Sequence, residues 1–143
     1  LEFRRVLFRS TTFSVLMARS KWNFEQVKNG ILTVQGLKKG DKILIAEGCS
    51  HRVTCHDIGR KLIPTLLEKY TKKKFVYDYV TGNDFPDDIA QYKLIIHCGG
   101  CMLNQKEIER RLKVCAKKKV AITNYGMMIS LAQGVFERVT NHI

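Results

Sequence analysis

The chain has 143 residues and is 45% hydrophobic, enough for one domain with its own core, and no apolar run is long enough to cross a membrane. Its five cysteines are odd in number and lack the spacing of a disulfide framework, which favours the reducing cytoplasm over secretion. The net charge of +12 includes the lysine runs 72–74 and 117–119, which lack interleaved aromatic residues, so we read them as solvated surface and expect no nucleic-acid partner.

The first forty residues contain three kinds of segment. Residues 1–10 match no element downstream, and we expect a non-native or artefactual leader. Residues 13–18 are strand-like. Asn23 can cap a helix, with Gln26 at the capping-box position, and the pattern then predicts one apolar helical face from Phe24, Val27, Ile31 and Leu32.

From residue 42 onward, strand and helix patterns alternate. Strands are predicted at residues 42–47, 74–80, 93–97 and 120–123, and helices at 63–70, 105–117 and 127–140, with a short turn at 86–90. Pro64 suits the first turn of its helix. The alternation indicates an α/β fold, a small parallel four-stranded sheet flanked by helices, with the flavodoxin-like strand order 2-1-3-4 as a working hypothesis.

Cysteines follow two of the predicted strands. Cys49 comes after the first strand, and Cys98 and Cys101 come after the third, on either side of two glycines. In the order 2-1-3-4 these strands are neighbours and their connections diverge, which is where open α/β sheets bind ligands. A redox pair of Cys98 and Cys101 leaves Cys49 without a role, whereas zinc and iron–sulfur ligation both use the three thiols, and the residues alone leave these two open.

The pattern Cys49-x-His51, followed after a long spacer by His97-Cys98-x-x-Cys101, resembles the signature of the FeFe-hydrogenase maturation GTPase family, HydF. The flanking segments 40–47 (GDKILIAE), 57–60 (DIGR), 97–104 (HCGGCMLN) and 122–126 (ITNYG) are also similar, and they occur in the family's order and spacing. The resemblance runs from about Thr11 to the C-terminus.

The resemblance implies a 4Fe–4S cluster on Cys49, Cys98 and Cys101. It also implies a non-enzymatic scaffold that carries a diiron precursor bearing CO and cyanide to apo FeFe-hydrogenase, with the radical-SAM maturases as further partners and a homodimer or tetramer as the assembly. Residues 11–40 would end a dimerisation domain, and 41–143 would form the cluster-binding domain. The chain contains no G-x-x-x-x-G-K-[ST] motif, so GTP would bind only in a domain missing here.

Further polar residues stand near the cysteines. A fourth ligand or a residue that orients the site is expected among His51, His56, Asp57 and His97, with Cys55 as a bystander or a fourth thiolate. We interpret His97 first as a structural histidine. Cys115 shares a helical stripe with Ile108 and Leu112, which predicts core packing. The alternative function is a zinc-stapled basic module for protein interaction or nucleic-acid binding.

Overall fold

The computed structural model describes residues 23–47, 58–82, 85–98 and 103–134. The strands are β1 (Lys42–Glu47), β2 (Val76–Thr81), β3 (Leu94–His97) and β4 (Ala121–Asn124). The helices are α2 (Phe24–Leu32), α4 (Ile63–Thr71), α5 (Gln105–Lys117) and α6 (Tyr125–Ala132). A 3-10 turn, Thr33–Gly36, follows α2, and a π-helical turn, Ile58–Leu62, leads into α4.

The four strands form one parallel sheet in the order β2-β1-β3-β4, which confirms the predicted fold class and strand order. The two central strands are buried along almost their whole length because helices cover both faces of a parallel sheet. That burial is why residues 43–46 and 94–96 read as continuous apolar runs rather than as alternating patterns.

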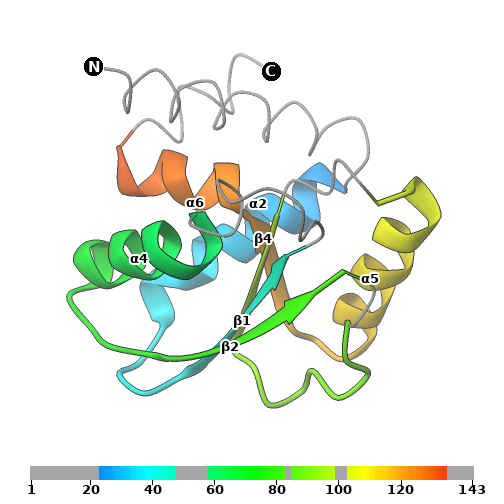
Figure 1. The fold of residues 1–143 in the computed structure, drawn as a ribbon, viewed down its shortest axis with the longest axis horizontal. Coiled ribbons are helices and arrows are strands. Elements are labelled where there is room, and N and C mark those ends of the chain that lie inside the picture. Colours follow the sequence, from blue (N-terminus) through cyan, green and yellow to red (C-terminus); the bar gives the residue numbers. More distant parts are fainter. Residues whose placement is uncertain (1–22, 48–57, 83–84, 99–102, 135–143) are drawn as a thin grey trace.

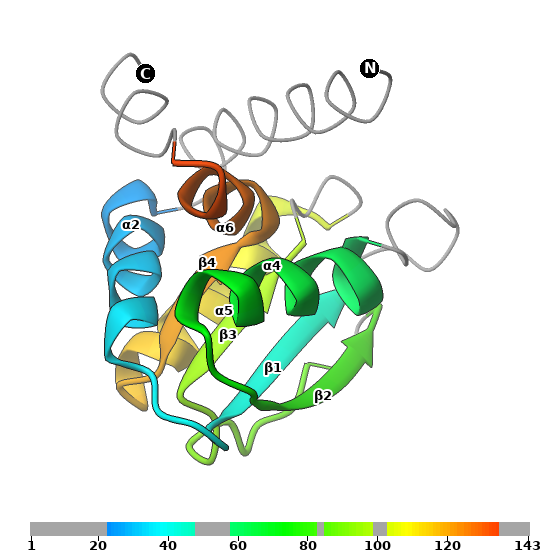
Figure 2. The ribbon, with the colours of Figure 1, turned by 90° about the vertical axis from the view of Figure 1, so that its left-hand side faces the viewer.

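The helices lie in two layers (Figures 1 and 2). Helices α2, α4 and α6 cover one face and α5 covers the other, as the crossovers β1–α4–β2 and β3–α5–β4 diverge from the centre of the sheet. The connection from β2 to β3 forms turns in its described residues 85–93 and adds Phe85, Ile89 and Tyr92 to the core.

Predicted and observed boundaries differ where local contacts decide them. The second strand begins at Val76 rather than at residue 74, because its pairing with β1 starts opposite Lys42. The last helix begins at Tyr125 rather than at residue 127, because the Asn124 side chain caps it by accepting from the Met127 amide at 2.9 Å. The helix ends at Ala132 and residues 133–134 form a turn, so its predicted continuation through them is wrong. Residues 135–140 lie outside the described residues. Pro64 occupies the first turn of α4, as predicted.

Helix α2 packs directly on β4. Asn23 caps it as predicted, but the Gln26 side chain donates to the carbonyl of Leu112 at 2.9 Å instead of closing a capping box. Val27 and Ile31 are fully buried, whereas Leu32 is 53% exposed, so its predicted place on the apolar face is wrong. Leu32 is five positions from Val27, which turns it away from the stripe that Val27 and Ile31 share.

The described part of the 11–40 segment therefore contributes to the same core as the sheet. The division of the chain at residue 40 stays a prediction. The leader 1–10 and the strand-like residues 13–18 lie outside the described residues.

The lysine runs lie at the amino-terminal edge of the sheet, where α4 leads into β2 and α5 leads into β4. Both runs, 72–74 and 117–119, are exposed. The charge of these two lysine runs is thus at the amino-terminal edge of the sheet, opposite the edge where β3 ends. None of the helices in the described part of the chain is both long and apolar enough to cross a membrane.

Candidate metal centre

The carboxyl-terminal ends of β1 and β3 lie side by side. Ala46 pairs with His97 in the parallel register, and the Cys98 amide donates to the Ala46 carbonyl at 2.9 Å. Cys98 is therefore next to the point where β1 ends at Glu47. Cys49 follows Glu47 by two positions in the sequence. The predicted adjacency of strands one and three is confirmed.

The chain returns to this edge after residues 48–57. Gly59 lies against Glu47 and Tyr125: a Cβ at Gly59 would be 3.0 Å from Glu47 Oε1 and would overlap the Tyr125 hydroxyl. Arg60 donates from Nε to the buried Glu47 carboxylate at 3.3 Å, with its guanidinium over the Tyr79 ring. The segment that contains Cys49 therefore starts and ends beside Glu47.

Cys98 is the predicted ligand that the structure describes. Cys98 directly follows β3 and is buried, with 6% of the residue exposed. Helix α5 begins shortly after it in the chain, and Asn104 caps that helix by accepting from the Glu107 amide at 2.8 Å. The Cys98 thiol is therefore at the carboxyl edge of the sheet, where open α/β sheets bind ligands.

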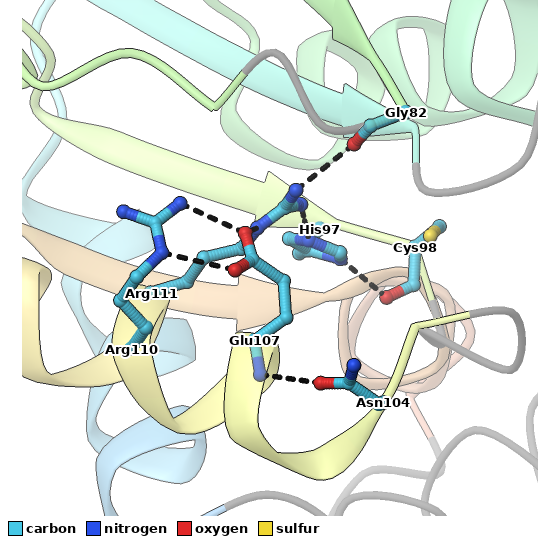
Figure 3. Close-up of polar contacts among 7 residues, drawn as sticks. All are labelled: Gly82, His97, Cys98, Asn104, Glu107, Arg110 and Arg111. Atoms are coloured by element: carbon cyan, nitrogen blue, oxygen red, sulfur yellow. Dashed lines mark hydrogen bonds and ion pairs between the residues drawn. The ribbon is translucent and has the colours of Figure 1, made fainter.

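His97 is fully buried, and both ring nitrogens have partners (Figure 3). Nδ1 is 2.8 Å from the carbonyl oxygen of Cys98, and Nε2 is 2.7 Å from Nη1 of Arg111. Burial, reinforced by the positive charge of Arg111, lowers the pKa of His97 to about 4. The imidazole is therefore neutral near pH 7. These contacts agree with the interpretation of His97 as a structural histidine.

Arg111 is the site residue that the sequence reasoning missed. It is only 1% exposed, and it donates from Nε to Glu107 at 2.8 Å and from Nη2 to the Gly82 carbonyl at 2.9 Å. Its guanidinium carbon lies 4.9 Å from the centroid of the Phe85 ring. The available signal was helical spacing, because Arg111 falls on the apolar stripe of Ile108, Leu112 and Cys115.

Glu107 completes this cluster as an anion between two arginines. Arg110 binds it through both Nε and Nη2, at 2.9 and 2.8 Å, and Arg111 binds it from the buried side. Hydrogen bonds from Arg110 and Arg111 lower the pKa of Glu107 to about 2. The carboxylate therefore stays charged and balances the buried guanidinium.

Cys115 packs in the core with Ile108 and Leu112, which confirms its predicted role. Burial raises the pKa of its thiol to about 12, so it is an inert thiol at neutral pH. Its side chain points from α5 into the core rather than to the sheet edge. Cys115 is therefore a suitable control cysteine for experiments on the predicted ligands.

The remaining predicted site residues lie outside the described residues. They are Cys49, His51, Cys55, His56, Asp57 and Cys101. Within the described part of the chain, no three His, Cys, Asp or Glu side chains group as metal ligands. Two of the three predicted thiols fall in the segments 48–57 and 99–102, so the ligand set stays a prediction.

Comparison with known families supports the motif resemblance. The family model of the hydrogen maturase F tetramerization domain matches residues 25–142, most of the chain. No individual curated protein matches it. A role in hydrogenase maturation and assembly into an oligomer follow from the family match. The chain therefore belongs to the hydrogen maturase F (HydF) family and carries its tetramerization domain.

Proposed function

We propose that this chain binds a 4Fe–4S cluster on Cys49, Cys98 and Cys101 and acts as a scaffold and carrier in FeFe-hydrogenase maturation. One observation carries the proposal: the Cys98 amide bonds to Ala46 at the end of β1. Both cysteine-bearing segments thus start from neighbouring points on one sheet edge. The return of Gly59 to Glu47 keeps the segment with Cys49 anchored at that edge at both ends.

The described residues fit such a group. Cys98 supplies a thiolate donor that is nearly buried, which limits access of oxidants and of bulk water. His97 is occupied at both ring nitrogens, so a fourth ligand is expected from His51, His56 or Asp57, or from solvent. Cys115 is excluded as a ligand by its position in the core.

A 4Fe–4S cluster held by three thiolates has one iron without a cysteine ligand, which supplies an exchangeable position. Such a position suits a carrier, because cargo can be released while the three thiolates stay in place. The cargo we propose is a diiron precursor bearing CO and cyanide. Apo FeFe-hydrogenase would receive it, and the radical-SAM maturases would supply it.

The role proposed for this chain is delivery within a homodimer or tetramer, without catalytic turnover of its own. GTP binding would belong to a separate domain. The cytoplasm, as a reducing compartment, suits cysteines that form no disulfide framework.

Anaerobic reconstitution distinguishes an iron–sulfur site from a zinc site. The full chain is incubated with iron and sulfide, or with zinc, and then desalted for metal analysis and visible absorption spectra. We expect iron and sulfide in equal amounts with a broad charge-transfer band, and Cys98→Ser should lose most of the iron. Cys115→Ser is the matched control and should keep it. Uptake of one zinc per chain with no stable iron would refute the cluster.

A further inference from the structure

The buried guanidinium of Arg111 connects three parts of the site. It reaches Glu107 on its own helix, Gly82 after β2 and His97 at the end of β3. Its flat face covers Phe85. A cation with this many directed contacts is held in a single orientation, because the planar guanidinium presents its N–H donors in a rigid fork.

The contact with Arg111 determines the tautomer of His97. Arginine has donors only, so His97 Nε2 must be the acceptor at 2.7 Å. The proton of the neutral ring is therefore on Nδ1, and Nδ1–H donates to the Cys98 carbonyl at 2.8 Å. The buried Arg111 side chain thus makes Nε2 of His97 the acceptor and Nδ1–H the donor.

The consequence for Cys98 is that both of its backbone polar groups have fixed partners. Its amide donates to Ala46 and its carbonyl accepts from His97. With the backbone held, the sulfur is restricted to the few staggered χ1 positions of one Cα–Cβ bond. This restraint matters because Gly99 and Gly100, the next residues in the sequence, are the residue type with the greatest backbone freedom.

We propose that Arg111 is a positioning residue that holds His97 as its Nδ1–H tautomer, so that the ring clamps the Cys98 carbonyl and stays out of the metal's coordination shell. The clamp on Cys98 is a property of the chain itself. The exclusion of His97 from coordination rests on the proposed function. An outer-shell group of this kind orients a ligand without binding the metal.

The test uses two adjacent arginines. Arg111→Met removes the buried guanidinium, and Arg110→Met is the matched control, because Arg110 binds the same Glu107 with a side chain that is 45% exposed. In the metal-free full chain, long-range proton–nitrogen NMR reads the His97 tautomer, assigned by the signal that His97→Gln removes. Iodoacetamide labelling with peptide mass spectrometry reads the reactivity of Cys98, and Cys115 reports whether the core stays folded.

The wild-type chain should show a protonated Nδ1 and a bare Nε2. Arg111→Met should mix the tautomers and raise the Cys98 labelling rate about fivefold, the factor that loss of one net hydrogen bond of about 1 kcal/mol gives. Cys115 should stay protected in this variant, and Arg110→Met should label like the wild type. A proton on Nε2 in the wild-type chain overturns the proposal, and so does an unchanged Cys98 rate with Cys115 protected. If Arg111→Met unfolds, so that Cys115 is labelled, the proposal is judged on the wild-type chain alone: a proton on Nδ1 of His97 supports it and a proton on Nε2 overturns it.

A second arm separates this inference from the proposed function. After iron–sulfur reconstitution, Arg111→Met should release iron to a chelator several-fold faster than wild type or Arg110→Met. Equal release rates in all three overturn the positioning role at the metal. A wild-type chain that takes up no iron contradicts the cluster, while the NMR and labelling results still decide the role of Arg111 at Cys98.

Discussion

The burial of His97 makes the stability of this fold depend on pH between about 4 and 6.5. Its pKa is about 4 in the folded chain against an ordinary value of 6.5, because the ring is buried beside Arg111. The unfolded chain therefore binds a proton at His97 between these values and the folded chain does not. Stability is complete above pH 6.5 and falls as the pH drops toward 4.

The size of this loss follows from the shift. The full difference corresponds to about 3 kcal/mol in unfolding free energy, of which about 2 kcal/mol is lost between pH 7 and pH 5. His97 is the one histidine in the described part of the chain, so this interval tests its burial directly. Glu107, with its pKa lowered to about 2, contributes to stability that is lost only below about pH 4.5.

The assay is urea unfolding of the metal-free full chain at pH 7, 6 and 5, followed by far-ultraviolet circular dichroism. His97→Gln is the comparison, because its amide oxygen can still accept from Arg111 but does not titrate. The variant should lose stability less steeply than wild type, with a difference in slope near 1 kcal/mol per pH unit. Identical slopes in the two proteins would show that His97 is not held neutral by burial, and the reasoning about Arg111 would fail with it.

Three further predictions test the core and the site. Gly30→Ala places a Cβ on the carbonyl oxygen of Ile122 and should cost about 1–3 kcal/mol in urea unfolding, whereas Gly36→Ala, with open space around it, should cost little; equal costs would contradict the packing of α2 on β4. Cys115→Ser should cost about 1 kcal/mol in unfolding free energy, since it places a hydroxyl in the core; loss of iron from a variant that stays folded would refute its purely structural role. Imidazole or cyanide added to the reduced, reconstituted chain should shift its electron paramagnetic resonance signal; an unresponsive spectrum, with Cys55→Ser losing the cluster, would make Cys55 a fourth thiolate.

The fold could be predicted from the sequence because the signals were local and strong. The apolar runs of β1 and β3 have turn residues on both sides, and α5 has an N-cap at Asn104. The strand order was a hypothesis taken from flavodoxin-like sheets, and the structure confirms it. The errors were at positions where tertiary contacts decide, such as Leu32, which lies just off the buried face of α2.

The polar half of the site could not be predicted in the same way. Arg111 was not predicted as a site residue because charged side chains are almost always exposed, and its burial depends on Glu107 one turn away and on His97 and Gly82 from distant segments. Glu47 is buried at the end of β1 for a similar reason, since Arg60, thirteen positions later in the sequence, binds its carboxylate. Spacing indicates that such residues lie on an apolar stripe, but only the fold reveals what they bind.

The central claim is that three cysteines of this chain hold one 4Fe–4S cluster. Native mass spectrometry of the anaerobically reconstituted chain tests it most directly, because it counts iron and sulfide on each polypeptide. We predict a mass increase of four iron and four sulfur atoms per chain in wild type and in Cys115→Ser. Cys49→Ser, Cys98→Ser and Cys101→Ser should each lose this species. An unmodified mass in wild type, or a full cluster in all three of those variants, would contradict the account.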